Sequence, residues 1–214
     1  MSVAQRQIFD PDCKRCARLS RFLGEVRTAH PDYHCGPVAP FGDPQARLLI
    51  VGLAPGKHGA NASGRPFTGD YAGILLYETL HRHGFSSAAT SQSATDGLKL
   101  HNCRISNAVK CLPPENKPLG EEINNCNGFL AAEIDAVARP AVVLALGAIA
   151  HNAVLKSRSK RLSHYRFRHG ATHALEQDLT LLDSYHCSRY NTQTRRLTPE
   201  MFDAVFKKLK RLLG

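Results

Sequence analysis

Short apolar runs alternate with amphipathic stretches along this chain. The runs cover residues 47–53, 141–146 and 179–184, and a further one ends near Val109. Such runs are typical of strands buried on both faces, and amphipathic stretches between them are typical of crossover helices. Four strands, each followed by a helix, predict an α/β fold, a three-layer α/β/α sandwich with a central four-stranded parallel sheet. Ligands bind at the carboxyl ends of the strands in such sheets, so the loops there are where chemistry is expected.

The spacing of apolar and capping residues also predicts the helices. Thr198 provides an N-cap and Pro199 a first helical residue for the last helix, which carries one apolar face. The segment 86–95 is low in hydrophobicity, and we expect a mobile loop there. The other predicted helices cover residues 13–29, 71–83, 119–139 and 147–155.

A chain of 214 residues is long enough to bury a core as one domain. We therefore expect a single domain over residues 1–214, with a distinct N-terminal segment over about residues 1–45. The longest apolar run, 141–150, is about half of what a bilayer-spanning helix requires. The first twenty residues lack the apolar core of a secretory signal. These features predict a cytoplasmic protein without a membrane partner, and we expect a monomer.

The charge balance favours a polyanionic partner. Lysine and arginine outnumber aspartate and glutamate by 28 to 18, giving a formal net charge of +10. A surplus of this size attracts nucleic acid through release of counterions. The same surplus could serve solubility alone, and composition does not separate the two interpretations.

Seven cysteines in a chain without a recognisable signal indicate a metal site or a reactive thiol rather than disulfides. Cys13 and Cys16 form a C-x-x-C pair, and Cys111 and Cys126 form a second pair fifteen residues apart. Together they supply four thiolates. Such a set can hold zinc or an iron–sulfur cluster, and spacing alone does not choose between them.

The segment that follows the first predicted strand contains five glycines in nineteen residues, from Gly52 to Asp70. Glycines let the backbone approach an anion or a flat ring closely. The segment lacks the G-x-x-x-x-G-K-S/T pattern of a phosphate-binding loop. An irregular surface loop is the alternative interpretation.

Three segments and one cysteine set carry a specific resemblance. The segments are 52–70 (GLAPGKHGANASGRPFTGD), 106–118 (SNAVKCLPPENKP) and 185–194 (YHCSRYNTQT), and the cysteines are the four named above. They resemble the first motif, the strand-end motif, the last motif and the cluster ligands of the uracil-DNA glycosylase superfamily, specifically its family 5, the B-type enzymes. The resemblance spans about residues 13–213.

This resemblance implies a monofunctional DNA glycosylase of base excision repair. Such an enzyme hydrolyses the N-glycosidic bond of uracil, and of other deaminated or modified bases, and leaves an abasic site in DNA. A four-iron, four-sulfur cluster is implied as the cofactor, held by the four cysteines and the N-terminal segment. The implied roles are catalytic for Asp70 and His186, substrate-binding for Gly52, Ala54, Phe67, Asn107 and Asn191, and DNA-binding for Arg189 and Tyr190.

The residue types suit these roles. The Phe67 ring can stack on a base that has been flipped out of the duplex, and the Asn107 amide can pair with the carbonyl and N–H of uracil. His186 can stabilise the negative charge that develops on the leaving base. Each residue also has an ordinary alternative, which is core packing for Phe67, a turn for Asn107, a helix N-cap for Asp70 and a structural role for His186.

Some positions depart from the family pattern. Cys187 and Tyr190 stand where relatives commonly have Val and Gln, and Ala62-Ser63 replaces Arg-Thr. These changes affect the expected affinity for DNA and the preference among bases, but they leave the proposed catalytic residues unchanged. Two other function classes stay open. One is a non-catalytic damaged-DNA-binding protein with the same fold and cluster, and the other is a nucleic-acid-binding module built on a four-cysteine zinc site.

Overall fold

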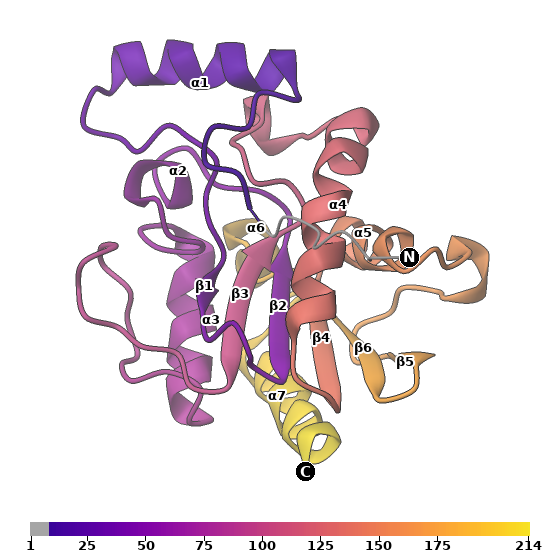
Figure 1. Cartoon of the computed structure of the whole chain (residues 1–214). Coiled ribbons are helices and arrows are strands. Elements are labelled where there is room, and N and C mark those ends of the chain that lie inside the picture. Colours follow the sequence, from indigo (N-terminus) through magenta and orange to yellow (C-terminus); the bar gives the residue numbers. More distant parts are fainter. Residues whose placement is uncertain (1–8) are drawn as a thin grey trace.

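The computed structural model describes residues 9–214 and contains one six-stranded sheet. The strands follow the spatial order β1-β3-β2-β4-β6-β5 (Figure 1). The middle four pair in parallel, and β1 and β5 pair antiparallel at the two edges. The strands are β1 (Phe41–Gly42), β2 (Leu48–Gly52), β3 (Cys103–Asn107), β4 (Ala141–Leu146), β5 (Thr172–Glu176) and β6 (Leu179–Ser184).

The four predicted parallel strands are confirmed, but the prediction of a purely parallel four-stranded sheet is incomplete. It missed β1, which is only two residues long, and β5, which lies in a polar stretch. Strand β5 exposes three of its five side chains, so its sequence lacks the apolar run by which the central strands were recognised. The sheet is therefore mixed, with short antiparallel strands closing both edges of the parallel centre.

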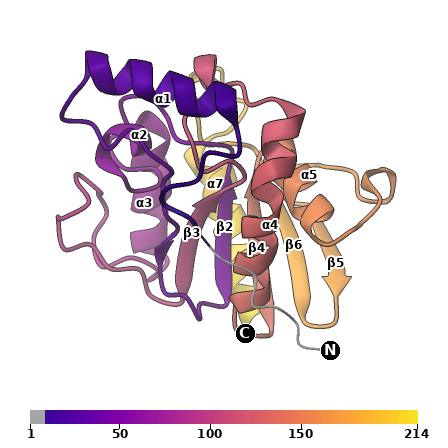
Figure 2. The ribbon, with the colours of Figure 1, turned by 45° about the horizontal axis from the view of Figure 1, so that its top comes forward.

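Helices cover both faces of the sheet, as the three-layer prediction requires. Alternate side chains of the central strands pack into two separate cores, with Ile50 facing one and Val51 the other. The first core includes α3 (Tyr71–Arg82) and α7 (Pro199–Leu213), and the second includes α4 (Gly120–Ala136) and α5 (Ala148–Ser157). Figures 1 and 2 show α4 on the opposite face of the sheet from α7.

Local capping explains where the helices begin. Asp70 accepts a hydrogen bond from the Gly73 N–H at the start of α3, and Thr198 accepts one from the Met201 N–H at the start of α7. Both residues have extended backbones and satisfy a free N–H of the first turn. The predicted capping by Thr198, with Pro199 as the first helical residue, is confirmed.

The N-terminal helix α1 (Ala17–Ala29) packs over one end of the sheet (Figure 2). Its buried residues Leu19, Leu23 and Val26 form a third small core with Val109 and the start of α4. The helix begins four residues later than predicted, because the C-x-x-C pair forms an irregular segment ahead of it. The predicted N-terminal segment of about residues 1–45 thus contains α1, while its first eight residues lie outside the described part.

In the described part of the chain, no helix has the length and apolar character needed to cross a membrane.

Candidate active site

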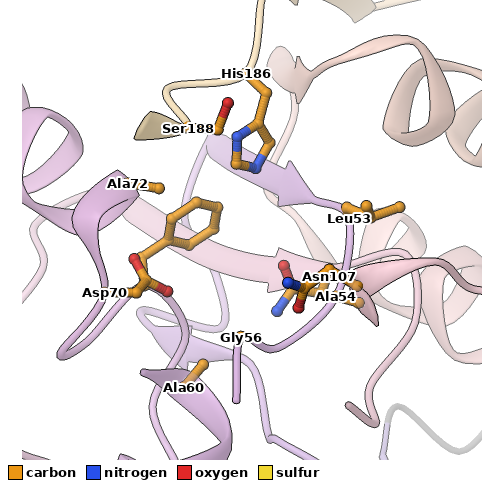
Figure 3. Close-up of a pocket in the computed structure, with 11 residues that line it drawn as sticks. Leu53, Ala54, Gly56, Ala60, Asp70, Ala72, Asn107, His186 and Ser188 are labelled. Carbon is orange, nitrogen blue, oxygen red and sulfur yellow. The ribbon is translucent and has the colours of Figure 1, made fainter. Parts of the chain in front are cut away.

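The loops that follow β2, β3 and β6 enclose a cavity of about 320 Å³ at the carboxyl edge of the sheet. This is the edge at which parallel α/β sheets bind ligands. In Figure 3 the side chains of Asp70, Asn107 and His186 surround the cavity from different sides. The lining residues are Leu53, Ala54, Gly56, Ala60, Phe67, Asp70, Ala72, Asn107, Asn116, His186 and Ser188.

Asn107 and Phe67 are brought together by a glycine at the end of β2. Gly52 pairs in register with Asn107, the last residue of β3. A Cβ atom on Gly52 would lie 2.4 Å from the Asn107 Oδ1 and 2.6 Å from the Phe67 ring. Any other residue at position 52 would therefore push one of these side chains aside. Gly52 acts by leaving room rather than by lining the cavity.

Asp70 combines a structural and a chemical position. Its Oδ1 accepts the Gly73 N–H at 2.9 Å as the cap of α3, which confirms the predicted N-cap alternative. The same carboxylate also lines the cavity, so the two positions are compatible. Burial raises the pKa of Asp70, and hydrogen bonds from the Gly73 and Ala72 backbones partly offset this rise. Gly59 leaves the space beside the carboxylate, because a Cβ there would lie 2.9 Å from Oδ2.

His186 faces Phe67 across the cavity wall. The two ring centroids lie 6.0 Å apart with an interplanar angle of 27°. Burial lowers the pKa of His186 to about 4, since the charged imidazolium would lose its hydration. The ring is therefore neutral at physiological pH and keeps one N–H as a hydrogen-bond donor.

A buried lysine, missed in the sequence, supports Asn107 from behind. The Lys110 ammonium donates to the Asn107 carbonyl at 2.8 Å and to Ser106 Oγ at 2.6 Å. It also pairs with the Glu133 carboxylate at 2.8 Å, and both charged side chains are almost fully buried. This pair joins the end of β3 to α4. In the sequence, Lys110 stands between Asn107 and Cys111, and the motif analysis assigned roles to those two residues but none to the lysine.

The last-motif residues are divided between the cavity and the surface. His186 and Ser188 line the cavity, whereas Asn191 does not. Asn191 instead donates from Nδ2 to the His186 carbonyl at 2.8 Å, so it holds the loop that carries the histidine. Arg189 and Tyr190 are exposed on α6 (Arg189–Gln193), with the Tyr190 side chain 71% exposed.

The structure brings the four predicted cysteine ligands together around one small cavity beside α1. Cys111 and Cys126 are buried, and Cys13 and Cys16 are half-buried. Burial, together with the three neighbouring thiols, raises the pKa of the Cys111 thiol to about 12. Four thiols crowded together in this way fit a cationic metal centre that would stabilise them as thiolates. Of the remaining cysteines, Cys103 and Cys187 are buried in the first core. Cys35 is buried in the third core, which also contains Cys111 and Cys126.

A second polar cluster lies near the carboxyl end of β6, away from the cavity. Asp183 accepts from His151 Nδ1 at 2.7 Å and from His173 Nε2 at 3.1 Å, and the other His151 nitrogen faces the Tyr165 carbonyl at 2.9 Å. Both nitrogens of His151 thus face oxygen acceptors, which requires the doubly protonated ring. These contacts satisfy the buried carboxylate without a metal ion. Their partners are distant in sequence, and no motif indicated them.

Comparison with known proteins shows the family to which this chain belongs. The family model of the Uracil DNA glycosylase superfamily matches residues 39–210. The chain belongs to the uracil-DNA glycosylase superfamily. Within it, the chain is similar to proteins named Type-5 uracil-DNA glycosylase, and the family predicted from the sequence is confirmed.

Two of these relatives illustrate the similarity. The protein of Thermus thermophilus is 45% identical over 207 residues, which are 94% of each chain. The protein of Pyrobaculum aerophilum is 39% identical over 201 residues, covering 92% of this chain and 87% of the relative. The crystal structure of Pedobacter heparinus SMUG2 aligns with a TM-score of 0.52 at 15% identity, covering 78% of this chain and 76% of that one. That likeness supports the α/β fold alone.

Proposed function

We propose that this chain is a monofunctional DNA glycosylase that hydrolyses the N-glycosidic bond of uracil in DNA and leaves an abasic site. The observation that carries the proposal is the convergence of Asp70, Asn107, His186 and Phe67 on one cavity at the carboxyl edge of the sheet. Relatives named Type-5 uracil-DNA glycosylase align with nearly the whole chain. Other deaminated or modified bases are further substrates under this proposal.

A labelled duplex with one uracil opposite guanine tests the proposal. Strand cleavage that requires alkali after incubation would establish release of the base by a monofunctional enzyme. Cleavage without alkali would indicate a lyase step instead. Specific binding without any release would favour the non-catalytic damaged-DNA-binding alternative.

The cavity suits recognition of a flipped uracil. Phe67 offers a ring face for stacking, worth roughly 1–3 kcal/mol per base. This gain is comparable to the few kcal/mol needed to extrude the base from the duplex. The Asn107 side-chain amide can accept from the uracil N–H and donate to its carbonyl. Lys110 fixes the Asn107 backbone carbonyl, and Gly52 leaves room for the side-chain amide.

Bond cleavage leaves the electron pair with the base and positive charge on the sugar. We assign to neutral His186 a hydrogen bond to a uracil oxygen, which stabilises the developing anion. Asp70, when ionised, stabilises the sugar cation and accepts a proton from the water that attacks C1′. The water oxygen forms the new bond to C1′, and the base departs with the electrons of the broken bond.

These roles predict a characteristic pH dependence of uracil release. The rate should be constant from about pH 7 to 9 and fall in acid. Burial raises the pKa of Asp70 above the usual aspartate value of about 3.9, so the carboxylate takes up its proton at a higher pH than an exposed aspartate does. His186 is already neutral well below this range, with its pKa lowered to about 4. Single-turnover rates across pH 4.5–9 provide the measurement. A rate that declined as pH rose through 6.5 would instead require the imidazolium form.

We also propose that Cys13, Cys16, Cys111 and Cys126 hold a four-iron, four-sulfur cluster. The four side chains line one small cavity beside α1. The similarity to proteins named Type-5 uracil-DNA glycosylase supports a cluster rather than a single zinc ion. When bound, the cluster would have a structural role, because it would join the segment before α1 to the loop after β3 and to α4.

The cluster assignment predicts that Cys126→Ser loses iron, because the serine oxygen is a poor ligand for iron–sulfur centres. Iron content and visible absorbance of the purified protein measure this loss directly, and soluble yield should fall with it. Cys103→Ser is the matched control, since Cys103 is buried in the sheet away from the four cysteines. Unchanged iron in Cys126→Ser would remove Cys126 from the ligand set, and stoichiometric zinc without iron would overturn the assignment.

The surface beside the cavity suits DNA. We propose that Arg189 and Tyr190, exposed on α6, contact the duplex around the flipped nucleotide. The Arg189 guanidinium lies 5.7 Å from the centre of the Tyr71 ring, and Tyr71 stands in the chain between the cavity-lining residues Asp70 and Ala72. The expectations of a monomer and of a cytoplasmic protein stay predictions.

A further inference from the structure

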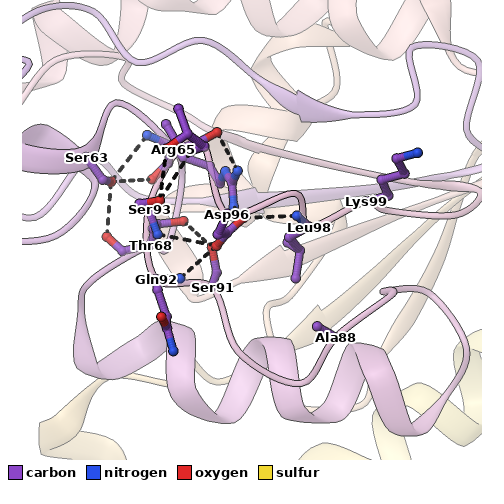
Figure 4. Close-up of polar contacts among 12 residues, drawn as sticks. Ser63, Arg65, Thr68, Ala88, Ser91, Gln92, Ser93, Asp96, Leu98 and Lys99 are labelled. Carbon is purple, nitrogen blue, oxygen red and sulfur yellow. Dashed lines mark hydrogen bonds and ion pairs between the residues drawn. The ribbon is translucent and has the colours of Figure 1, made fainter.

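Two residues close to Phe67 in the chain, Arg65 two positions before it and Thr68 directly after it, are both bonded to one serine of a distant loop. Ser91 Oγ accepts from the Arg65 guanidinium at 3.0 Å and shares a hydrogen bond of 2.6 Å with Thr68 Oγ1. Figure 4 shows these contacts between the segment that follows α2 (Ala60–Ser63) and the loop of residues 86–98. This loop, named here the bracing loop, touches the chain on both sides of the proposed stacking residue.

The bracing loop is itself ordered by a buried ion pair. The Arg65 guanidinium, whose side chain is 5% exposed, bonds the Asp96 carboxylate at 2.7 Å and the Ala94 carbonyl at 2.7 Å. The same carboxylate accepts the backbone N–H groups of Gln92 at 2.8 Å and Leu98 at 3.0 Å. Arg65 thus fixes the loop conformation that presents Ser91. The low hydrophobicity of the loop had predicted mobility and gave no sign of this attachment.

Phe67 needs such support, because its backbone is in the left-handed region with φ of +56°. A non-glycine residue in this region is strained by about 1–3 kcal/mol and persists only where its surroundings determine it. The carbonyl before it, that of Pro66, accepts from the buried Tyr77 hydroxyl at 2.8 Å. On the other side the Thr68 carbonyl accepts from Ser63 Oγ at 3.2 Å.

We propose that Ser91 is a positioning residue for base recognition. It holds Arg65 and Thr68 so that the strained backbone between them directs the Phe67 ring into the cavity. The ring is then already in position to stack on a flipped base before any base arrives. This inference rests on the proposed function and extends it to a loop outside the motifs that the sequence singled out.

The test compares Ser91→Ala with Ser93→Ala in the full-length, cluster-loaded protein. Ser93 belongs to the same loop, but its hydroxyl bonds only within the loop, to Thr95. Ser91→Ala should lower the single-turnover rate of uracil release about tenfold, because a misplacement of about 1 Å at a reacting centre can cost up to a hundredfold. Ser93→Ala should keep the rate within about twofold of the parent.

A second readout separates positioning from a general loss of structure. Affinity for the same duplex with a tetrahydrofuran abasic site, which has no base to stack, should change less than twofold in Ser91→Ala. In a Phe67→Leu background, Ser91→Ala should also have less than a twofold effect on the rate, since the side chain that it positions is gone. Thr68→Val should reproduce the loss, and Thr68→Ser, which keeps the hydroxyl, should restore the rate.

An unchanged rate in Ser91→Ala would overturn the inference, and so would equal losses of excision and of abasic-site binding. Full additivity of Ser91→Ala with Phe67→Leu would also overturn it. Uracil release by the parent protein distinguishes failure of this inference from failure of the proposed function. If the parent releases no uracil, the proposed function fails first, whereas an active parent confines the failure to the role of Ser91.

Discussion

Asp70→Asn is expected to reduce the rate of uracil release by about a thousandfold. Asparagine has the same shape and is as good an N-cap as aspartate, so it should still accept the Gly73 N–H that begins α3. What it removes is the negative charge beside the cavity. The developing sugar cation then loses its counter-charge, and the attacking water loses its proton acceptor.

The measurement is a single-turnover assay on the uracil–guanine duplex with saturating enzyme. Affinity for an abasic-site duplex and the unfolding midpoint serve as controls, and both should stay near those of the parent. The residual activity of Asp70→Asn should also lack the decline in acid that we predict for the parent. A well-folded Asp70→Asn variant with the parental rate would exclude Asp70 from the mechanism.

The second large effect concerns stability, through the buried contacts of Asp183. Asp183→Asn should lower the free energy of unfolding by about 3 kcal/mol, because it removes the charge that balances the His151 imidazolium. Both side chains are almost fully buried, so neither gains solvent in compensation. His173 and the Arg168 N–H also lose their charged acceptor.

The loss should depend on pH in a definite direction. Burial alone would lower the pKa of His151, but its contacts with Asp183 and the Tyr165 carbonyl raise it above the ordinary value. A group whose pKa is raised in the folded state stabilises fully below its unfolded pKa of about 6.5, and this contribution declines as pH rises through the folded pKa. Asp183→Asn should therefore cost most near pH 6 and less in alkaline solution.

Urea denaturation at several pH values between 6 and 9 measures this dependence. Asp178→Asn is the matched control, since Asp178 is exposed in the turn between β5 and β6 and asparagine tolerates its φ of +61°. The control should stay within about 0.5 kcal/mol of the parent. Equal losses for both variants, or a loss that grew as pH rose, would contradict the assignment of an imidazolium at position 151.

The central fold was predictable because its signal is local. Strands such as β2 and β4 are continuous apolar runs, and helices such as α7 carry a cap and one apolar face. Edge strands were not predictable in this way. Strand β1 has only two residues, and β5 is mostly exposed, so pairing with neighbours rather than side-chain pattern defines them.

The site was predictable where residues follow strand ends and not where contacts are distant. Gly52, Asn107 and His186 belong to recognised motifs at the ends of β2, β3 and β6, and the fold brings them together. Lys110 and Ser91 support that site through contacts that no periodicity encodes. The Asn191 amide donates to the His186 carbonyl, a contact that its motif did not indicate, and the predicted role of Asn191 in substrate binding stays a prediction.

The cavity walls come from residues as far apart as Leu53 and Ser188. During synthesis on the ribosome, β2, the first strand of the parallel centre, therefore emerges well before His186, which lines the same cavity. Since β2 lies between β3 and β4, it also waits for both neighbours before its edges are paired. A nascent chain thus has no competent catalytic pocket until its last motif has emerged, and base excision begins only with a nearly finished polypeptide.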